Sequence, residues 1–122
     1  RSSTLIISEI SVKDIKPNHN KYDLVLYYSL FHHLLKTQSI DEIAQMIKKQ
    51  TKKYCIIEVP IMGDRLLDKV MQKVADAGYF QCLKSIESFR HHLALNQIKV
   101  NKCIHLDYGN DQLMRYAYLC SL

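Results

Sequence analysis

Short apolar runs alternate along the chain with segments whose apolar residues recur at helical spacing. The runs at 22–28 and 54–59 are apolar at nearly every position, and a shorter apolar run spans 4–7. Strands that are buried on both faces have this continuous pattern, and such strands belong to parallel sheets that helices cover. We therefore expect three strands in the first half of the chain, two of which are fully buried.

Helical spacing follows each of the two longer runs. Ser39 and Glu42 have the spacing of a capping box. The apolar residues behind them fall on one helical face, at Ile40, Ile43, Ala44 and Ile47. Asp64 is expected to cap a second helix, whose apolar stripe continues until Gly78 ends it. A further short helix is expected over 85–95.

The last quarter of the chain predicts an antiparallel hairpin. Residues 98–106 and 113–122 have the pattern of strands, and the turn-rich stretch 107–111 joins them. Because the chain has no linker and no internal repeat, we expect residues 1–122 to form a single domain. The predicted order is strand, strand, helix, strand, helix, helix, strand, strand. This order gives an α/β fold with a parallel core and an antiparallel edge.

Composition excludes several classes of protein. The 122 residues are 48% hydrophobic, with three Gly and two Pro, which excludes a disordered or collagen-like chain. No apolar run reaches the roughly 20 residues that a membrane-spanning helix needs, and no signal-peptide pattern opens the chain. The chain begins with Arg1 rather than Met. We therefore expect it to be a piece of a longer protein.

The net charge of +5 comes mainly from lysine, which accounts for 13 of the 17 basic residues. Proteins that bind nucleic acids rely on Arg for bidentate contacts, so this excess favours a solvated surface over a nucleic-acid interface. The four cysteines are widely spaced and form no CxxC pair, which favours a reduced, cytoplasmic protein. No His or Cys group has the spacing of metal ligands, so no metal site is expected.

Two segments resemble the class I S-adenosylmethionine (SAM)-dependent methyltransferases. YDLVLYYSLFHHLL at 22–35 is similar to that family's fourth-strand motif, and YCIIEVPI at 54–61 is similar to its fifth strand, which commonly ends in Glu and Pro. The terminal hairpin also fits, because these folds end in a hairpin that adds one antiparallel strand to the sheet. FHHLLKTQSIDEIAQMI more narrowly resembles methyltransferases that terminate bacterial O-antigen chains. The resemblance implies a Rossmann-like methyltransferase fold with SAM as its cofactor.

The sequence departs from the family in its cofactor site. The family binds SAM with a Gly-rich loop after its first strand and an acidic residue after its second, whereas Gly63, Gly78 and Gly109 are isolated. Glycine is needed in such a loop because the backbone turns tightly and approaches the ligand. The resemblance therefore implies the carboxyl-terminal half of the fold. We expect residues 1–122 to be a partial domain that needs a missing amino-terminal half. By itself, this partial domain is expected to bind SAM weakly or not at all and to be inactive.

Candidate cofactor contacts follow from the resemblance, because ligands of open α/β sheets bind beyond the carboxyl ends of the strands. Glu9 and Ile10, which follow the first strand of this chain, are placed against the adenine of SAM. An ordinary exposed loop is the alternative for these two residues. Tyr27, Tyr28 and Ser29, which end the second run, are placed beside the methionine and the methyl group.

The residues that follow are candidates for the acceptor side of the site. Phe31 and Glu58 are candidate substrate contacts, although Glu58 could instead have a capping or salt-bridge role. His32 and His33 are candidate catalytic bases, because the pKa of histidine lies near working pH. Neighbouring helix positions point about 100° apart, so only one of the two histidines can face a ligand.

The expected reaction transfers a methyl group from SAM to an oxygen or nitrogen atom of a small-molecule, sugar or lipid-linked acceptor. Two alternatives stay open. One is a degenerate methyltransferase half that binds a partner without catalysis. The other is a methyltransferase that acts on nucleic acid, which the basic charge suggests and which steep salt dependence of binding would support.

The missing half also has a consequence for assembly. In the family's sheet the first strand lies beside the fourth, so its absence leaves the strand at 22–28 with an unpaired edge. Either a second copy pairs with this edge and gives a homodimer, or the strand at 4–7 moves in to fill it.

Overall fold

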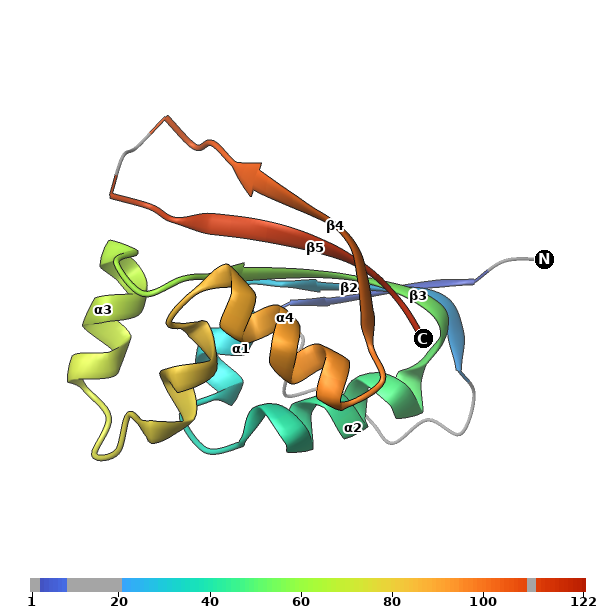
Figure 1. The fold of residues 1–122 in the computed structure, drawn as a ribbon, viewed down its shortest axis with the longest axis horizontal. Coiled ribbons are helices and arrows are strands. Elements are labelled where there is room, and N and C mark those ends of the chain that lie inside the picture. The colour runs from blue at the N-terminus through green and yellow to red at the C-terminus, as the bar shows by residue number, and fades with distance from the viewer. Residues whose placement is uncertain (1–2, 9–20, 110–111) are drawn as a thin grey trace.

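Five strands form one mixed sheet, and the helices pack against one of its faces (Figure 1). The computed structural model describes residues 3–8, 21–109 and 112–122. The strands are β1 (Thr4–Ser8), β2 (Tyr22–Tyr28), β3 (Thr51–Pro60), β4 (Lys99–Leu106) and β5 (Arg115–Ser121). The helices are α1 (Phe31–Leu34), α2 (Ile40–Gln50), α3 (Arg65–Gln72) and α4 (Ile86–Leu95), with a 3-10 helix, η2, at Gly78–Leu83.

The strands lie in the order β1-β2-β3-β5-β4. β1, β2 and β3 are parallel, whereas β5 is antiparallel to β3 and β4 is antiparallel to β5. This arrangement confirms the predicted α/β fold with parallel strands and a terminal antiparallel hairpin. Because Pro60 at the end of β3 pairs with Arg115 at the start of β5, residues from distant parts of the chain meet at the carboxyl ends of the parallel strands.

The predicted capping box starts α2. The Ser39 hydroxyl accepts a hydrogen bond from the Glu42 N–H at 3.2 Å, and the Glu42 carboxylate accepts one from the Ser39 N–H at 3.4 Å. The apolar residues predicted on its inner face are buried, at Ile40, Ile43, Ala44 and Ile47. Ser85 caps α4 in a similar way, through the N–H of Ser88. No helix within the described ranges is long and apolar enough to cross a membrane.

The second predicted helix is shorter than its apolar stripe indicates. Asp64 caps α3 as expected, but the helix ends at Gln72, and Gly78, predicted to end it, instead begins η2. The Asp76 carboxylate accepts a hydrogen bond from the Gly78 N–H at 2.8 Å. Such local bonding of Asp to the backbone two residues on competes with helix formation around Gly78. The helix itself has already ended, with the Lys73 N–H bonded to the Val70 carbonyl at 3.1 Å.

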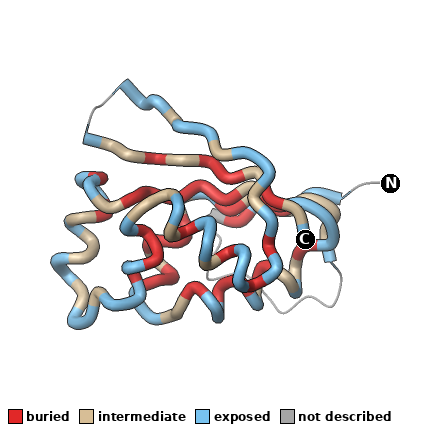
Figure 2. Tube along the Cα trace, in the orientation of Figure 1, coloured by how far each residue is buried: buried red, intermediate tan, exposed pale blue. Residues whose placement is uncertain are grey.

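The core lies between the sheet and the helices. In β2, β3 and β5, the side chains that point toward the helices are buried, and Figure 2 shows this as red segments on the facing strands and helices. These residues include Val25, Tyr27, Cys55, Ile57, Val59, Tyr118 and Cys120. The ring of Phe31 lies edge-on to that of Phe89, with centroids 5.7 Å apart, and so joins α1 to α4 through the core.

β1 fills the edge of β2 within one chain. Ile6 lies opposite Leu26, and the Leu24 N–H donates to the Ser3 carbonyl at 3.1 Å. Ser3 and Asp23 exchange two further hydrogen bonds, of 2.9 and 3.3 Å. Of the two predicted arrangements of this edge, the structure has the filled one, and a homodimer stays a prediction.

Candidate functional site

A connected group of polar side chains lies at the carboxyl ends of β2 and β3. Ser29 follows β2, and Glu58 lies near the end of β3. The Ser29 hydroxyl donates to the Glu58 carboxylate at 3.1 Å. With Asp64, Tyr108 and Arg115, described next, these residues form what we call the Glu58 cluster. Ligands of open α/β sheets bind at this edge, so the cluster is the candidate site.

The backbone of Ser29 has a left-handed conformation, with φ of 51°. For a residue other than glycine, this conformation costs about 1–2 kcal/mol. Such strain persists only where the surrounding structure enforces it, and it is concentrated at functional sites. Here the turn from β2 into α1 and the bond to Glu58 hold Ser29 in place.

Glu58 receives donors from three directions. Besides Ser29, the Tyr108 hydroxyl donates to Oε2 at 3.1 Å, and Nη1 of Arg115 lies 3.8 Å from Oε1. Burial, and then the nearby Glu58 carboxylate, raise the pKa of the Tyr108 phenol, so the phenol keeps the proton that it donates. Glu58 is only 7% exposed, and these donors compensate its burial.

Arg115 links Glu58 to a second carboxylate. Its Nε donates to Oδ2 of the fully buried Asp64 at 2.9 Å, and the Met114 N–H donates to the same oxygen at 2.9 Å. Burial alone would raise the pKa of Asp64, but the Arg115 hydrogen bond and the backbone donors outweigh it and hold this pKa below its usual value. Asp64 therefore stays ionised and ties the start of α3 to the start of β5.

The predicted cofactor residues at the end of β2 lie in different environments. Tyr27 is fully buried, and its hydroxyl donates to Gln50 at 3.0 Å on the helix side, so its side chain does not reach the cluster. Tyr28 is 37% exposed on the opposite face, and Ser29 belongs to the cluster. Glu9 and Ile10 lie outside the described residues, and their adenine contacts stay a prediction.

α1 carries the predicted histidines and Phe31. Phe31 is fully buried between Tyr27 and Phe89, so it serves the core and is not placed to contact a substrate as predicted. His32 is 8% exposed and His33 is half-buried, with ring centroids 4.2 Å apart. The two rings lie close together and are tilted by 43° to each other. His33 is the more accessible of the two, and catalysis by either stays a prediction.

Three members of the cluster were not predicted as site residues. Arg115 had a signal in the sequence, since it is a charged residue within the strand pattern at 113–122. In the structure this residue is buried. Asp64 was predicted only as a helix cap. Tyr108 lies in the turn-rich stretch between the last two strands, where nothing in the sequence indicates its contact with Glu58.

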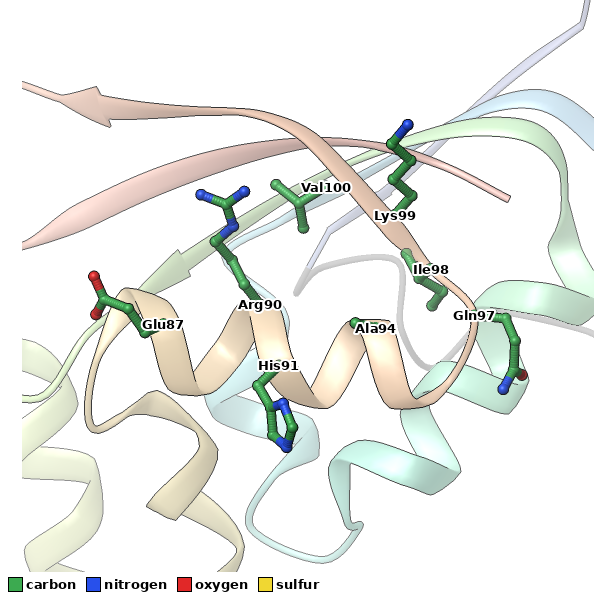
Figure 3. Close-up of a pocket in the computed structure, with 8 residues that line it drawn as sticks. All are labelled: Glu87, Arg90, His91, Ala94, Gln97, Ile98, Lys99 and Val100. Atoms are coloured by element: carbon green, nitrogen blue, oxygen red, sulfur yellow. The ribbon is translucent and has the colours of Figure 1, made fainter.

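Two hollows lie away from the cluster. One, of about 600 Å³, lies between α4 and β4 and is lined by Glu87, Arg90, His91, Ala94, Gln97, Ile98, Lys99 and Val100 (Figure 3). The other, of about 500 Å³, lies at the amino ends of β2 and β3 and is lined by Ser3, Thr4, Asp23, Leu24, Lys52, Lys53 and Tyr54. Across 3–8, 21–109 and 112–122, no three His, Cys, Asp or Glu side chains are grouped as metal ligands would be.

Comparison with known proteins supports the fold. No protein-family profile and no curated protein sequence matches the chain. Among solved structures, the chain is similar to magnesium protoporphyrin IX methyltransferase (ChlM) from Synechocystis PCC 6803 with bound SAH, with a TM-score of 0.52 and 15% sequence identity. The match covers 84% of this chain and 45% of that one, so this chain spans less than half of the solved enzyme. The chain therefore has a Rossmann-like methyltransferase fold.

Proposed function

We propose that this chain is part of a SAM-dependent methyltransferase and that the Glu58 cluster borders its acceptor site. The observation that carries the proposal is the strained backbone of Ser29 and its hydrogen bond to Glu58. Both residues lie at the carboxyl ends of β2 and β3 in a chain with a methyltransferase fold. The acceptor would be methylated on oxygen or nitrogen, and would be a small molecule, a sugar or a lipid-linked compound. The remaining part of the active site would come from an amino-terminal half beyond these 122 residues, and we expect a cytoplasmic enzyme.

The residues present fit one side of a SAM site. Tyr28 offers a partly exposed ring, and Ser29 offers its backbone and hydroxyl beside the carboxyl end of β2. When bound, SAM supplies a methyl group that its positively charged sulfur activates. Since that charge disappears during transfer, the protein mainly has to position the acceptor.

Glu58 is the residue best placed to position an acceptor. Its two oxygens already accept hydrogen bonds from the hydroxyls of Ser29 and Tyr108. An acceptor hydroxyl or amine could replace one of these donors without leaving the carboxylate unpaired. Arg115 contacts the Glu58 carboxylate and is itself held by Asp64. The Glu58 carboxylate would therefore orient the acceptor with little rearrangement.

The cofactor part of the proposal is tested by titrating the ¹⁵N-labelled chain with SAH, the product that SAM leaves after methyl transfer. The titration is followed by NMR. We expect weak binding, with amide shifts at Tyr28, Ser29 and the end of β3, because these residues fit only one side of the ligand. ATP, which shares the adenosine but has no sulfur, is the matched control and should leave Ser29 unchanged. Amide shifts confined to the hollow between α4 and β4, or no shifts at millimolar SAH, would contradict the proposal.

The affinity distinguishes a partial site from a complete one. Micromolar binding of SAH by residues 1–122 would show that the chain holds a whole cofactor site, against the expectation of a missing half. If a longer protein that contains this chain is active, Glu58→Gln should lower kcat/KM for the acceptor. A longer protein that binds a partner but transfers no methyl group would instead favour the degenerate interaction module.

A further inference from the structure

Two tyrosine rings flank the Glu58 carboxylate on the face of the sheet that is turned away from the helices. Tyr27 pairs with Ile57 in the parallel register of β2 and β3, so Tyr28 lies beside Glu58 one residue further on. Tyr28 is 37% exposed and Tyr108 is 56% exposed, whereas Glu58 is only 7% exposed. A buried carboxylate thus lies next to two rings that reach solvent.

Tyr108 reaches Glu58 from the turn that follows β4. Its hydroxyl donates to Oε2 of Glu58 at 3.1 Å, across 50 residues of sequence. Burial and then Glu58 raise the pKa of the Tyr108 phenol, and Tyr28 adds a smaller rise, so the three groups are within electrostatic reach of one another. We call Tyr28, Glu58 and Tyr108 the tyrosine–glutamate site.

The negative charge of Glu58 is less fully compensated than that of Asp64. Nε of Arg115 donates to Asp64 at 2.9 Å, whereas its Nη1 lies 3.8 Å from Glu58, beyond hydrogen-bond distance. One guanidinium therefore serves two carboxylates, and its hydrogen bond goes to the fully buried one. Glu58 accepts from two neutral hydroxyls, of Ser29 and Tyr108, although a carboxylate offers about four acceptor positions.

Other charged side chains on the adjoining segments are exposed or partly exposed. They are Lys36 after α1, Arg65, Asp68 and Lys69 on α3, and Asp107 before Tyr108. Among the described residues, none of these lysines and arginines lies within 4.0 Å of Glu58 as Arg115 does. Water and salt screen charges that are exposed in this way. The balance that a bound group meets is therefore set by Glu58, Asp64 and Arg115, which is one negative charge in excess.

This combination of groups suits an alkylammonium ion. A cation over the face of a tyrosine ring is attracted by the electrons of the ring, and proteins bind alkylammonium ligands between such rings. The N–H groups of an ammonium also supply charge-assisted donors for the free acceptor positions of Glu58. A neutral alcohol gains neither the attraction to the rings nor the charge assistance, and Glu58 repels an anion.

The charge that moves during methyl transfer also favours nitrogen over oxygen at this place. An ammonium first loses one proton to water, and the lone pair of the resulting amine forms the bond to the methyl carbon while the electrons of the carbon–sulfur bond return to sulfur. The positive charge thus moves from sulfur to nitrogen, where a fixed carboxylate stabilises it as it develops. A hydroxyl acceptor must instead develop negative charge on oxygen, which Glu58 would repel.

We propose that Tyr28, Glu58 and Tyr108 bind the alkylammonium group of an amine acceptor, so that methylation occurs on nitrogen. The assignment of this acceptor class rests on the proposed methyltransferase function and narrows it. Tyr108 would exchange its hydrogen bond to Glu58 for one from the acceptor and keep its ring against the alkyl group.

Three probes with the same alkyl chain test the acceptor class: butylammonium, 1-butanol and butyrate. Binding to the ¹⁵N-labelled 122-residue chain is followed by NMR at neutral pH, through the amide shifts of Tyr28, Ser29 and Glu58. We expect butylammonium to bind at least about tenfold more tightly than 1-butanol. Because the chain has a net charge of +5, nonspecific attraction would favour butyrate instead. Equal affinity for butylammonium and 1-butanol, or tighter binding of butyrate, would overturn the proposal.

A charge variant locates the preference at Glu58. Glu58→Gln removes the charge and keeps the shape, so the preference for butylammonium over 1-butanol should fall below about threefold. Glu87→Gln is the matched control, since Glu87 is an exposed carboxylate on α4, on the other side of the sheet, and it should keep the full preference. An equal loss in both variants would mean that only the overall charge matters, and the proposal would be wrong.

Ring variants test the aromatic part of the site. Tyr108→Leu should weaken butylammonium at least about fivefold, whereas Tyr108→Phe keeps the ring and should bind like the original chain. Tyr108 is an exposed turn residue, so these variants remain informative if Glu58→Gln folds poorly. Tyr54→Leu, at an equally exposed tyrosine near the amino end of β3, is the matched control and should change nothing. Unchanged binding by Tyr108→Leu would overturn the proposal.

The SAH titration separates the acceptor class from the methyltransferase function. SAH shifts at Ser29 together with no preference for butylammonium would overturn the amine acceptor and leave the methyltransferase standing. A butylammonium preference that Glu58→Gln abolishes, in a chain that shows no shifts with SAH, would support the alkylammonium site and contradict the proposed function.

Discussion

At the scale of single residues, Arg115 joins two buried carboxylates that do not touch each other. Its guanidinium lies 2.9 Å from Asp64 and 3.8 Å from Glu58. Buried ion pairs are costly to break, because removing one partner leaves an uncompensated charge behind. The position of Glu58 therefore depends on Asp64 through Arg115. The Glu58 cluster is a unit that stability measurements can probe before any activity is known.

Asp64→Asn should destabilise the chain at neutral pH more than in acid. Because the folded-state pKa of Asp64 lies below its unfolded value of about 3.9, the charged form contributes its full stability above about pH 4. That contribution is lost as the pH falls through the folded-state pKa. Asparagine keeps the cap but not the charge, so we expect a loss of about 3 kcal/mol at pH 7 that shrinks below pH 4. Urea unfolding between about pH 7 and pH 2.5 measures the difference.

Asp68→Asn is the matched control for this experiment. Asp68 lies in the first turn of the same helix, is partly exposed, and only accepts a 3.4 Å hydrogen bond from the Gly63 N–H. Its substitution should cost less than about 1 kcal/mol at any pH. A pH dependence as large for Asp68→Asn as for Asp64→Asn would show that the charge of α3 matters, and not the pair with Arg115.

The four cysteines should differ in reactivity with iodoacetamide in the native state. Cys55, Cys82 and Cys120 are buried, whereas Cys103 is partly exposed on β4. Burial raises the pKa of Cys82 to about 12 and also raises the pKa of Cys103. Since alkylation needs an accessible thiolate, Cys103 should react first and the other three only on unfolding. A peptide mass-spectrometry time course that shows Cys55 or Cys120 alkylated as fast as Cys103 would contradict the sheet register.

At the scale of elements, α4 ends in a motif that normally contains glycine. The Ile98 N–H donates to the Leu93 carbonyl at 2.9 Å, and the Gln97 N–H donates to that of Ala94 at 3.0 Å, which is the Schellman pattern. Gln97, at the left-handed position, has φ of 60°. Ile98 and Leu93 are both buried, as the motif's apolar contact requires.

Gln97→Gly should stabilise the chain by about 0.5–1 kcal/mol, because glycine adopts this conformation without the penalty that a Cβ imposes. The side-chain bond of Gln97 with Lys48 is exposed, and its loss offsets little of the gain. Gln97→Ala is the control, since it removes the same side chain but keeps the Cβ. Thermal unfolding should place the glycine variant above both other proteins. A glycine variant no more stable than the alanine variant would show that the backbone at Gln97 is not strained.

Local signals predicted the elements well where they act within a few residues. The capping box at Ser39 and Glu42 and the cap at Asp64 were read correctly, because each depends on contacts within one helical turn. The length of α3 was not, because the apolar stripe up to Gly78 gives no hint that the helix ends at Gln72 and that Asp76 then bonds the backbone of Gly78. Hydrophobic spacing shows which face of a segment is buried, but not whether the segment stays one helix.

At the scale of the whole molecule, pairing between distant strands decided what the sequence left open. Glu58 was predicted as a site residue because it ends a strand, whereas Tyr108 joins it from 50 residues away, across the hairpin. The filled edge of β2 was one of two predicted arrangements, since a parallel connection from β1 was sterically possible. Sequence patterns identify strands, but their order and register come from packing that involves the entire chain.

Two proline variants of β1 test this edge. The Leu24 N–H donates to the Ser3 carbonyl, so in a parallel ladder the Leu5 N–H points toward β2 and the Ile6 N–H points toward the open edge. Leu5→Pro therefore removes a ladder hydrogen bond, while Ile6→Pro removes none, as edge positions tolerate. We expect light scattering to show a monomer for the original chain and for Ile6→Pro, because β1 fills the edge of β2 in both.

Amide hydrogen exchange reads out the result within β2 itself. The N–H groups of Leu24 and Leu26 point toward β1, and those of Val25 and Tyr27 point toward β3. Leu5→Pro should speed exchange at Leu24 and Leu26 at least about tenfold and leave Val25 and Tyr27 protected, whereas Ile6→Pro should change neither pair. Fast exchange at Leu26 in the original chain would show that β1 does not hold this edge in solution. The edge would then be free to pair with another copy, and the homodimer would become the better account of the assembly.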